Sequence, residues 1–253
     1  MRRLDVLVAA TAIVLLGGAA PLAAQVPDSF TNLKVLPKNI SREQLDRVMD
    51  SFTEGLGVRC DFCHVRDTTK LVRGRPRMDF ASDKKDHKKT ARVMLRMVQD
   101  INAKYLTQLE GGSDIHVQCF TCHHGNKTPE RLENVLFAAY LGGGPDSVAT
   151  AYRNLREQYY GRAIYDFGEG TLIATARMIA QVPNRTNNLP AAIAVLDLNT
   201  SYFPKSVATL ANIAFIYARA GDTTKAIAAM TQAQGLEPDN PQLARMLQRL
   251  KGH

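Results

Sequence analysis

Apolar residues recur at helical spacing in a segment that leads into a pair of cysteines. Ser41 and Gln44 have the spacing of a capping box, and the pattern after them continues until Gly55 and Gly57. Its apolar face consists of Leu45, Val48, Met49, Phe52 and Leu56. This pattern predicts a short amphipathic helix.

A second amphipathic segment follows. Asp83 is suited to cap a helix of roughly 25 residues, which the Gly111-Gly112 pair would end. Its apolar face consists of Ala91, Met94, Val98, Ile101 and Tyr105. The region from about 32 to 130 is therefore a unit used twice, and each copy consists of a helix, a turn and a cysteine motif. No strand-like alternation is evident. We therefore predict a mainly α-helical fold.

The C-terminal part is separated from this region by Gly142-Gly143-Gly144-Pro145, which predicts a boundary, and Ser147 to Tyr160 predicts a helix. Further on, Ala192-Ile193-Ala194 recurs 34 residues later as Ala226-Ile227-Ala228. Pro204 and Pro238 repeat with the same period. This is the period of tetratricopeptide helix hairpins.

The repeat pattern extends in both directions. The consensus positions of the clearest repeat are Leu210, Ala214, Tyr217, Ala226, Ala233 and Pro238. A preceding copy, from about 171 to 204, is degenerate because Pro183 interrupts its first helix. Gln242 to Leu250 predicts a capping helix. We expect a short tetratricopeptide-like helical repeat module.

The N-terminal residues 1–24 have the layout of a secretory signal peptide. Arg2 and Arg3 precede an apolar stretch that ends in small residues before Gln25. We expect an exported, periplasmic protein, and an uncleaved segment would instead anchor it in a membrane. The remaining residues, in a chain of 253 with 45% hydrophobic content, suffice for two modest domains.

The positive charge of the chain is regional. Its formal net charge is +8, and loss of Arg2, Arg3 and Asp5 with the signal would leave +7. Residues 66–104 hold 12 Lys or Arg against 5 Asp or Glu, a difference of +7. A solvated helix face, or compensation of the acidic groups of a bound cofactor, explains this better than docking of an acidic partner, and export argues against nucleic acid.

All 4 cysteines lie in two CxxCH motifs, Cys60 to His64 and Cys119 to His123. Two thiols at this spacing suit thioether bonds to the vinyl groups of one haem, and the following histidine supplies the proximal iron ligand. A four-cysteine zinc site leaves both histidines unexplained, and a thioredoxin-like motif would need an α/β pattern. The motifs therefore predict two covalently bound haems c, on Cys60, Cys63 and His64 and on Cys119, Cys122 and His123.

The sixth iron ligand is less determined by the sequence. Met49 and Met94 each lie on the helix before a motif, although a methionine on an apolar face is usually a packing residue. Met97 is the alternative to Met94. The other histidines, His87, His116 and His124, are weaker candidates. We expect His87 to face solvent and His124 to contact solvent or a haem propionate.

At these residues the chain resembles the cytochrome subunit of photosynthetic reaction centres, in the half that holds its first two haems. The resemblance covers about 32–130 and includes Asn32 to Leu36, Arg92 to Met97, and Cys119 to His123 with Gly125 and Pro129. In that family a methionine of the leading helix is the sixth ligand, which implies Met49 and Met94 here. The chain departs from the family in having only two motifs followed by repeats.

Together these features predict a dihaem cytochrome c domain over 25–140 and a helical linker with repeats over 141–253. We expect an electron carrier that passes single electrons between periplasmic or membrane redox partners, with the repeats suited to protein contact. The rival interpretations are a dihaem peroxidase or reductase, which needs an open iron site, and a repeat-based scaffold with structural haems.

Overall fold

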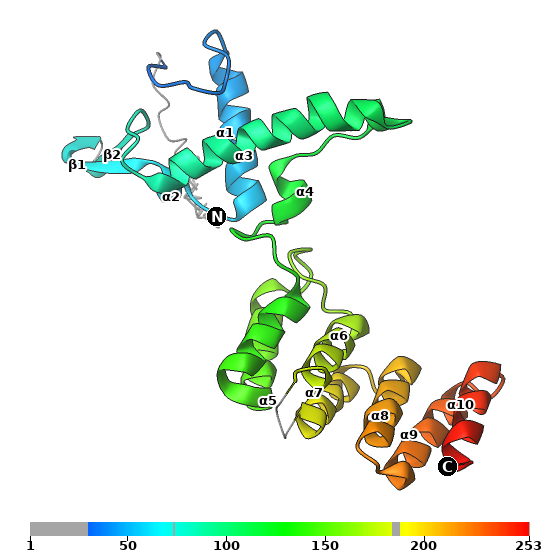
Figure 1. The fold of residues 1–253 in the computed structure, drawn as a ribbon. Coiled ribbons are helices and arrows are strands. Elements are labelled where there is room, and N and C mark those ends of the chain that lie inside the picture. The colour runs from blue at the N-terminus through cyan, green and yellow to red at the C-terminus, as the bar shows by residue number, and fades with distance from the viewer. Residues whose placement is uncertain (1–29, 73, 184–187, 253) are drawn as a thin grey trace, which may run out of the picture.

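The computed structural model describes residues 30–72, 74–183 and 188–252. The predicted signal peptide lies outside these residues. The elements of the N-terminal half are α1 (Arg42–Leu56), α2 (Cys60–Cys63), β1 (Val65–Val72), β2 (Arg75–Asp79), α3 (Asp86–Asp100) and α4 (Cys119–His123). Those of the C-terminal half are α5 (Leu132–Tyr159), α6 (Glu169–Ala180), α7 (Asn188–Tyr202), α8 (Val207–Arg219), α9 (Thr223–Leu236) and α10 (Pro241–Lys251). Figure 1 shows α1 to α4 grouped at one end and α5 to α10 at the other. The mainly α-helical fold is confirmed.

Helix α1 forms as its sequence predicts. The Gln44 backbone N–H donates to the Ser41 hydroxyl at 3.2 Å, and the Ser41 backbone N–H donates to the Gln44 side chain at 3.0 Å. Both bonds satisfy donors that the first turn of a helix leaves free. The helix ends at Gly57, whose φ of 62° is left-handed.

Gly57 also lies against the chain after the second CxxCH motif, because a Cβ atom there would meet the carbonyl oxygen of Gly125. We expect Gly57→Ala to destabilise the protein by more than the roughly 1–2 kcal/mol that a left-handed backbone costs a side chain. Gly111→Ala is the matched control, since Gly111 has a φ of 69° and no atom within 4 Å of its would-be Cβ. Urea unfolding of both variants checks this, and equal losses would contradict the close approach.

The hairpin of β1 and β2 corrects the expectation that the chain has no strands. Val65–Val72 pairs antiparallel with Arg75–Asp79, with an irregularity in register between Asp67 and Leu71. The sequence shows no apolar alternation here because most of the hairpin is exposed, so neither face has to be apolar. Backbone pairing alone identifies it.

Asp83 does not cap α3, contrary to the prediction. The helix begins at Asp86 after an N-cap residue, Lys85, that makes no side-chain capping bond. Asp83 instead accepts hydrogen bonds from Asn32 at 2.9 Å, Lys34 at 2.8 Å and Arg92 at 2.8 Å. Pairing with the cations Lys34 and Arg92 adds a charge attraction that a cap to a neutral backbone amide lacks. Asp83 therefore joins the segment before α1 to α3.

The bond from Lys34, with those from Asn32, Arg92 and Lys88, holds the pKa of Asp83 well below its ordinary value of 3.8. A pKa that folding lowers gives stability that is present above the unfolded value and is lost as the pH falls toward the folded one. We expect Asp83→Asn to lower the midpoint of unfolding clearly at about pH 6 and less at about pH 2. Thermal unfolding at both values checks this, and an equal loss at both would contradict it.

Helix α3 continues without a break into wider and tighter turns. Ile101–Tyr105 forms a π-helical turn and Leu106–Gln108 a 3₁₀ turn. The helical path thus runs nearly to the predicted Gly111-Gly112 end. In this part of the helical path, Asn102 hydrogen-bonds to Val117 in the segment that leads into α4.

The Gly142–Pro145 segment is a kink inside α5, where Gly143 and Gly144 leave helical geometry. The half of α5 before the kink already belongs to the C-terminal core: Leu132, Leu136 and Tyr140 are buried with it, and the Tyr140 hydroxyl donates to Asn188 at 3.1 Å. The expected division at residue 140 therefore falls within one packed unit. We propose that the division lies near residue 131.

The remaining helices follow one another as packed pairs, α6 with α7 and α8 with α9, and α10 packs on α9 (Figure 1). The predicted capping helix is α10. These pairs are the hairpins that the 34-residue period predicts, and their assignment to the tetratricopeptide class stays a prediction. Within the described residues, no helix has the length and apolarity needed to span a bilayer.

Candidate haem centres

The first CxxCH motif forms the single turn of α2. The His64 backbone N–H donates to the Cys60 carbonyl at 3.0 Å, which closes the turn. Residues three and four positions apart lie on the same side of a helical turn. Cys60, Cys63 and His64 therefore reach one common cavity.

This cavity has a volume of about 390 Å³. It lies between α1, α2, the start of α3 and the segment from Phe30 to Leu36, and its walls are mostly apolar. The wall residues that matter most here are Cys60, Cys63, His64, Met49, Phe80 and Leu95. Its size falls within the roughly 300–1,000 Å³ of cofactor pockets.

His64 has the surroundings expected of an iron ligand. Its Nδ1 atom is buried and has no hydrogen-bond partner among the described residues, and the ring meets Phe80 edge-on at 5.0 Å. Burial, together with the positive charge of Lys88, lowers the pKa of His64. A lowered pKa favours the neutral ring, which is the form that ligates a metal. Two thiols, a neutral imidazole and an apolar cavity fit a covalently bound haem.

Met49 lies on the same cavity from the facing helix α1. Of the two methionines proposed as sixth ligands, only Met49 lines a described cavity together with the cysteines and histidine of its own motif. A thioether facing the cavity that also holds His64 is the arrangement that a His-Met pair needs. Its ligation stays a proposal.

Two cations complete this wall. Lys88 is buried and donates to the carbonyls of Phe80, Ala81 and Ser82 at 2.8, 3.0 and 2.9 Å. Arg92 donates to Asp83 and to the Asn32 carbonyl at 3.1 Å. These bonds join α3 to the segment before it and to the segment before α1, a role that sequence reasoning missed because most of the partners are backbone carbonyls.

The second motif is α4, which an extended segment positions. Asn102 donates to the Val117 carbonyl at 2.8 Å and accepts from the Val117 N–H at 2.9 Å. Gln118 then donates from its backbone to the Thr121 hydroxyl at 3.0 Å. These bonds hold the start of α4 beside the end of the α3 path.

The proximal histidine of this motif is oriented by its own loop. His123 Nδ1 lies 2.9 Å from the Asn126 carbonyl oxygen. A carbonyl only accepts, so Nδ1 carries the proton and Nε2 keeps its lone pair for a metal. Such a bond fixes the ring orientation of a ligating histidine.

The methionine proposed as sixth ligand for the second motif does not line the described cavity. Met94 is half-buried on α3 and does not line the first cavity, although Ala91 and Leu95 do. The first cavity therefore does not relate Met94 to the second motif. Met97, the alternative, is 43% exposed.

The weaker histidine candidates lie at the surface. His87, His116 and His124 are exposed, which confirms the expectation for His87 and agrees with that for His124. His124 adopts a left-handed backbone with φ of 49°, and its ring meets Phe120 edge-on at 5.6 Å.

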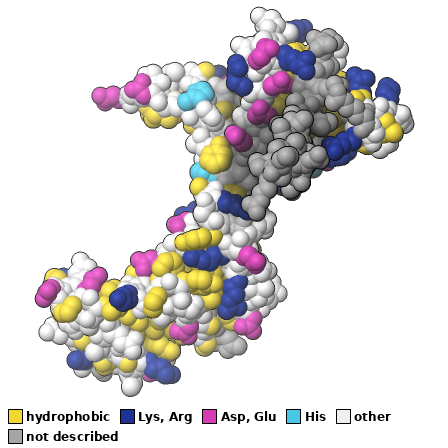
Figure 2. All heavy atoms as spheres, turned by 180° about the vertical axis from the view of Figure 1, so that it is seen from behind, with side chains coloured by type: hydrophobic (Ala, Val, Ile, Leu, Met, Phe, Trp, Pro, Cys, Tyr) yellow, Lys and Arg dark blue, Asp and Glu magenta, His cyan; other side chains and the backbone are white. Residues whose placement is uncertain are grey.

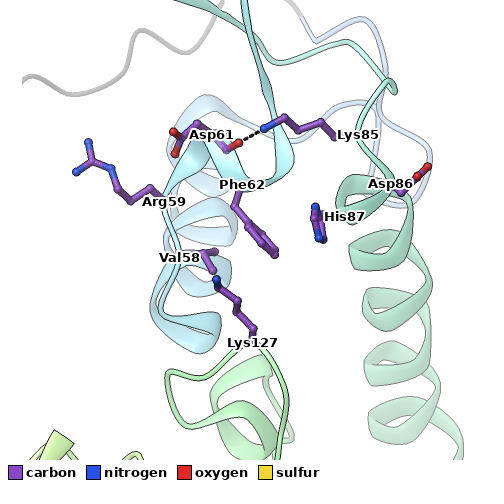
Figure 3. A pocket seen from close by; sticks show the side chains of 8 residues that line it. All are labelled: Val58, Arg59, Asp61, Phe62, Lys85, Asp86, His87 and Lys127. Carbon is purple, nitrogen blue, oxygen red and sulfur yellow. Dashed lines mark hydrogen bonds between the residues drawn. The ribbon is translucent and has the colours of Figure 1, made fainter. Parts of the chain in front are cut away.

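An open pocket of about 620 Å³, lined mostly by charged residues, lies beside the first motif (Figure 3). The Phe62 ring at its centre lies 4.0 Å from the His87 ring and 5.2 Å from Lys127 Nζ. Arg59 and Lys85 add positive charge, while the Asp61 carboxylate is paired with Arg66. Lys127 lies far from this motif in sequence, so its place here could not be predicted.

The sequence is similar to those of known cytochromes. A family described as photosynthetic reaction centre cytochrome C subunit matches residues 8–148, more than half of the chain. Cytochrome c-554 of Chloroflexus aurantiacus is 36% identical over 110 residues, which are 43% of this chain and 23% of that protein. The photosynthetic reaction center cytochrome c subunit of Roseobacter denitrificans is 25% identical over 107 residues, 42% of this chain and 26% of that protein. The chain thus covers about a quarter of each relative.

Proposed function

Since the chain belongs to the family of photosynthetic reaction centre cytochrome c subunits, we propose that it is a dihaem electron carrier that passes single electrons between redox proteins and transforms no substrate. Membership makes it a c-type cytochrome of electron transfer, with covalently bound haem c. The number of haems, their ligands and the partners belong to the proposal.

The observation that carries the proposal is the cavity shared by Cys60, Cys63, His64 and Met49. The two thiols would form thioether bonds, His64 would give a ring nitrogen to the iron, and Met49 would close the other side with a sulfur. Haem iron, when bound, takes up and releases one electron. A site closed by two protein ligands favours electron transfer over substrate binding.

The second haem is proposed on Cys119, Cys122 and His123, with Met94 as the sixth ligand. The bond from His123 to the Asn126 carbonyl supports the role of that histidine. Large apolar side chains along the path into α4 are more than two-fifths exposed: Met97, Tyr105, Leu109, Ile115 and Phe120. A porphyrin covering part of this surface would remove it from water.

The two cations at the first cavity bear on its redox poise. Lys88 and Arg92 lie at the wall and both pair with Asp83. The wall also carries Lys34 and Arg59 against Asp46 and Asp50, so positive charge exceeds negative charge there. Positive charge near a haem disfavours the oxidised iron. We expect this site to have a relatively high potential.

The partners and the compartment follow from the family only in outline. Reaction centre cytochrome subunits act outside the cytoplasm, and the Roseobacter relative is named for such a complex. We propose an extracytoplasmic carrier, exported through residues 1–24. The C-terminal helices carry a broad group of hydrophobic side chains on one face (Figure 2). Such a face suits contact with a protein partner.

An optical redox titration of the purified protein tests this proposal. We expect two one-electron steps, and a reduced spectrum with the sharp bands of low-spin haem c. Replacing both cysteines of one motif should remove one of the two one-electron steps, and replacing both cysteines of the other motif should remove the other. A spectrum that does not respond to reductant, or an oxidised protein with a high-spin iron, would contradict the carrier function.

A further inference from the structure

The loop after the second motif is held from two sides. The Gly125 backbone N–H donates to the Gly55 carbonyl of α1 at 2.9 Å. On its other side, a Cβ atom at Gly125 would lie 3.4 Å from the Ile164 side chain. The segment that follows the proximal histidine thus lies between the haem-binding half and the chain that links α5 to α6.

A hydrogen bond extends this contact to the histidine itself. The Asn126 side-chain amide donates to the Tyr165 hydroxyl at 2.6 Å. The backbone carbonyl of the same Asn126 accepts from His123 Nδ1 at 2.9 Å. One residue therefore joins the proximal histidine to a tyrosine 42 positions further along the chain.

Tyr165 is fixed by the C-terminal helices. Its ring meets Tyr159 edge-on at 5.6 Å and Phe167 at 6.4 Å. Phe167 is 6% exposed and belongs to the C-terminal core. Arg156 of α5 donates to the Phe167 carbonyl at 3.3 Å and lies 4.0 Å from the Tyr160 ring. These contacts leave the Tyr165 hydroxyl little freedom to follow movements of the loop.

We propose that Tyr165 is a positioning residue for His123, through which the C-terminal helices set the strength of the iron ligand at the second haem. By holding the Asn126 side chain, it keeps the Asn126 carbonyl where it accepts the Nδ1 proton. A hydrogen bond at Nδ1 makes the imidazole a stronger donor to a metal. A stronger donor stabilises the oxidised iron and lowers the reduction potential.

This inference rests on the proposed haem at Cys119 to His123, and it adds a role for the C-terminal module beyond partner contact. The chain of bonds predicts an effect on the second haem alone. The first haem lies in a cavity to which neither Asn126 nor Tyr165 contributes.

The test compares the full-length haem-loaded variants Tyr165→Phe and Tyr159→Phe by optical redox titration. Tyr165→Phe keeps the ring and removes the hydroxyl, so we expect one of the two potentials to rise while the other stays unchanged. Tyr159→Phe changes a neighbouring ring that takes no part in the bonds from Tyr165 through Asn126 to His123. It should change neither potential. Asn126→Ala keeps the backbone carbonyl and should show the same rise in potential. It replaces Tyr165→Phe in the test if that variant folds poorly.

A second readout is the exchange rate of the His123 Nδ1 proton with solvent, followed by NMR. It should increase in Tyr165→Phe and Asn126→Ala and stay unchanged in Tyr159→Phe. Unchanged potentials and exchange in both variants, or equal shifts of both potentials, would overturn the positioning role. A wild-type protein with no haem on the second motif would be recognised from its haem count before any variant, and would overturn the proposed function instead.

Discussion

Replacing Cys60 and Cys63 together by alanine is expected to leave the protein with one haem and an unstable N-terminal half. Both thiols line the first cavity, and without thioether bonds the haem would be held only by axial ligands. The haem count from a pyridine haemochrome assay should fall from two to one. The matched pair Cys119→Ala with Cys122→Ala should lose the other haem.

The size of the cavity explains why the loss should be large. At about 24 cal/mol per Å³, a rigid cavity of about 390 Å³ left without its haem would cost about 9 kcal/mol. That is an upper bound because the walls can move inward, but it is comparable with the whole stability of a typical domain, about 5–15 kcal/mol. We expect α1 and the segment from Phe30 to Leu36 to lose protection from hydrogen exchange. A double variant that retains two haems would rule out the first motif as an attachment site.

Replacement of the two methionines proposed as axial ligands should change ligation and leave the fold intact. Leucine keeps the volume and apolarity of methionine, so Met49→Leu and Met94→Leu should each cost less than about 1.5 kcal/mol in packing. Each should lose part of the weak near-infrared band that sulfur-to-iron ligation gives the oxidised protein. Each should also lower one of the two potentials, because the soft thioether favours the reduced iron.

Met97→Leu is the control for the second site. Met97 lies three residues from Met94 on α3 and is 43% exposed, whereas Met94 is half-buried. If Met94 is the ligand, Met97→Leu keeps the full near-infrared band and both potentials. Loss of the band in Met97→Leu with its retention in Met94→Leu would move the assignment to Met97.

Local features of the chain could be predicted from the sequence. The capping box of Ser41 and Gln44 and the helical end at Gly57 involve residues within a few positions, and both form as expected. The amphipathic pattern of α1 also identified Met49, which faces the cavity from that helix. The sequence pattern was sufficient to predict a feature when that feature depends on residues of one helix alone.

Features that depend on distant contacts could not be predicted. Asp83 had the spacing of a helix cap, but Lys34 and Asn32, which lie 49 and 51 residues away in sequence, bind it instead. Lys88 gave no signal because it binds backbone carbonyls, and the Tyr165 to Asn126 bond joins residues of two modules. The kink at Gly143 and Gly144 reads as a boundary in sequence, yet packing continues across it.

The measurement that tests the account most directly is the number of haems on the exported, purified protein, counted by pyridine haemochrome absorbance per mole of chain and by intact mass. The two CxxCH motifs predict two haems c, each attached by a pair of thioether bonds, in every chain. A mass equal to that of the polypeptide alone, or with a single haem, would contradict the dihaem carrier.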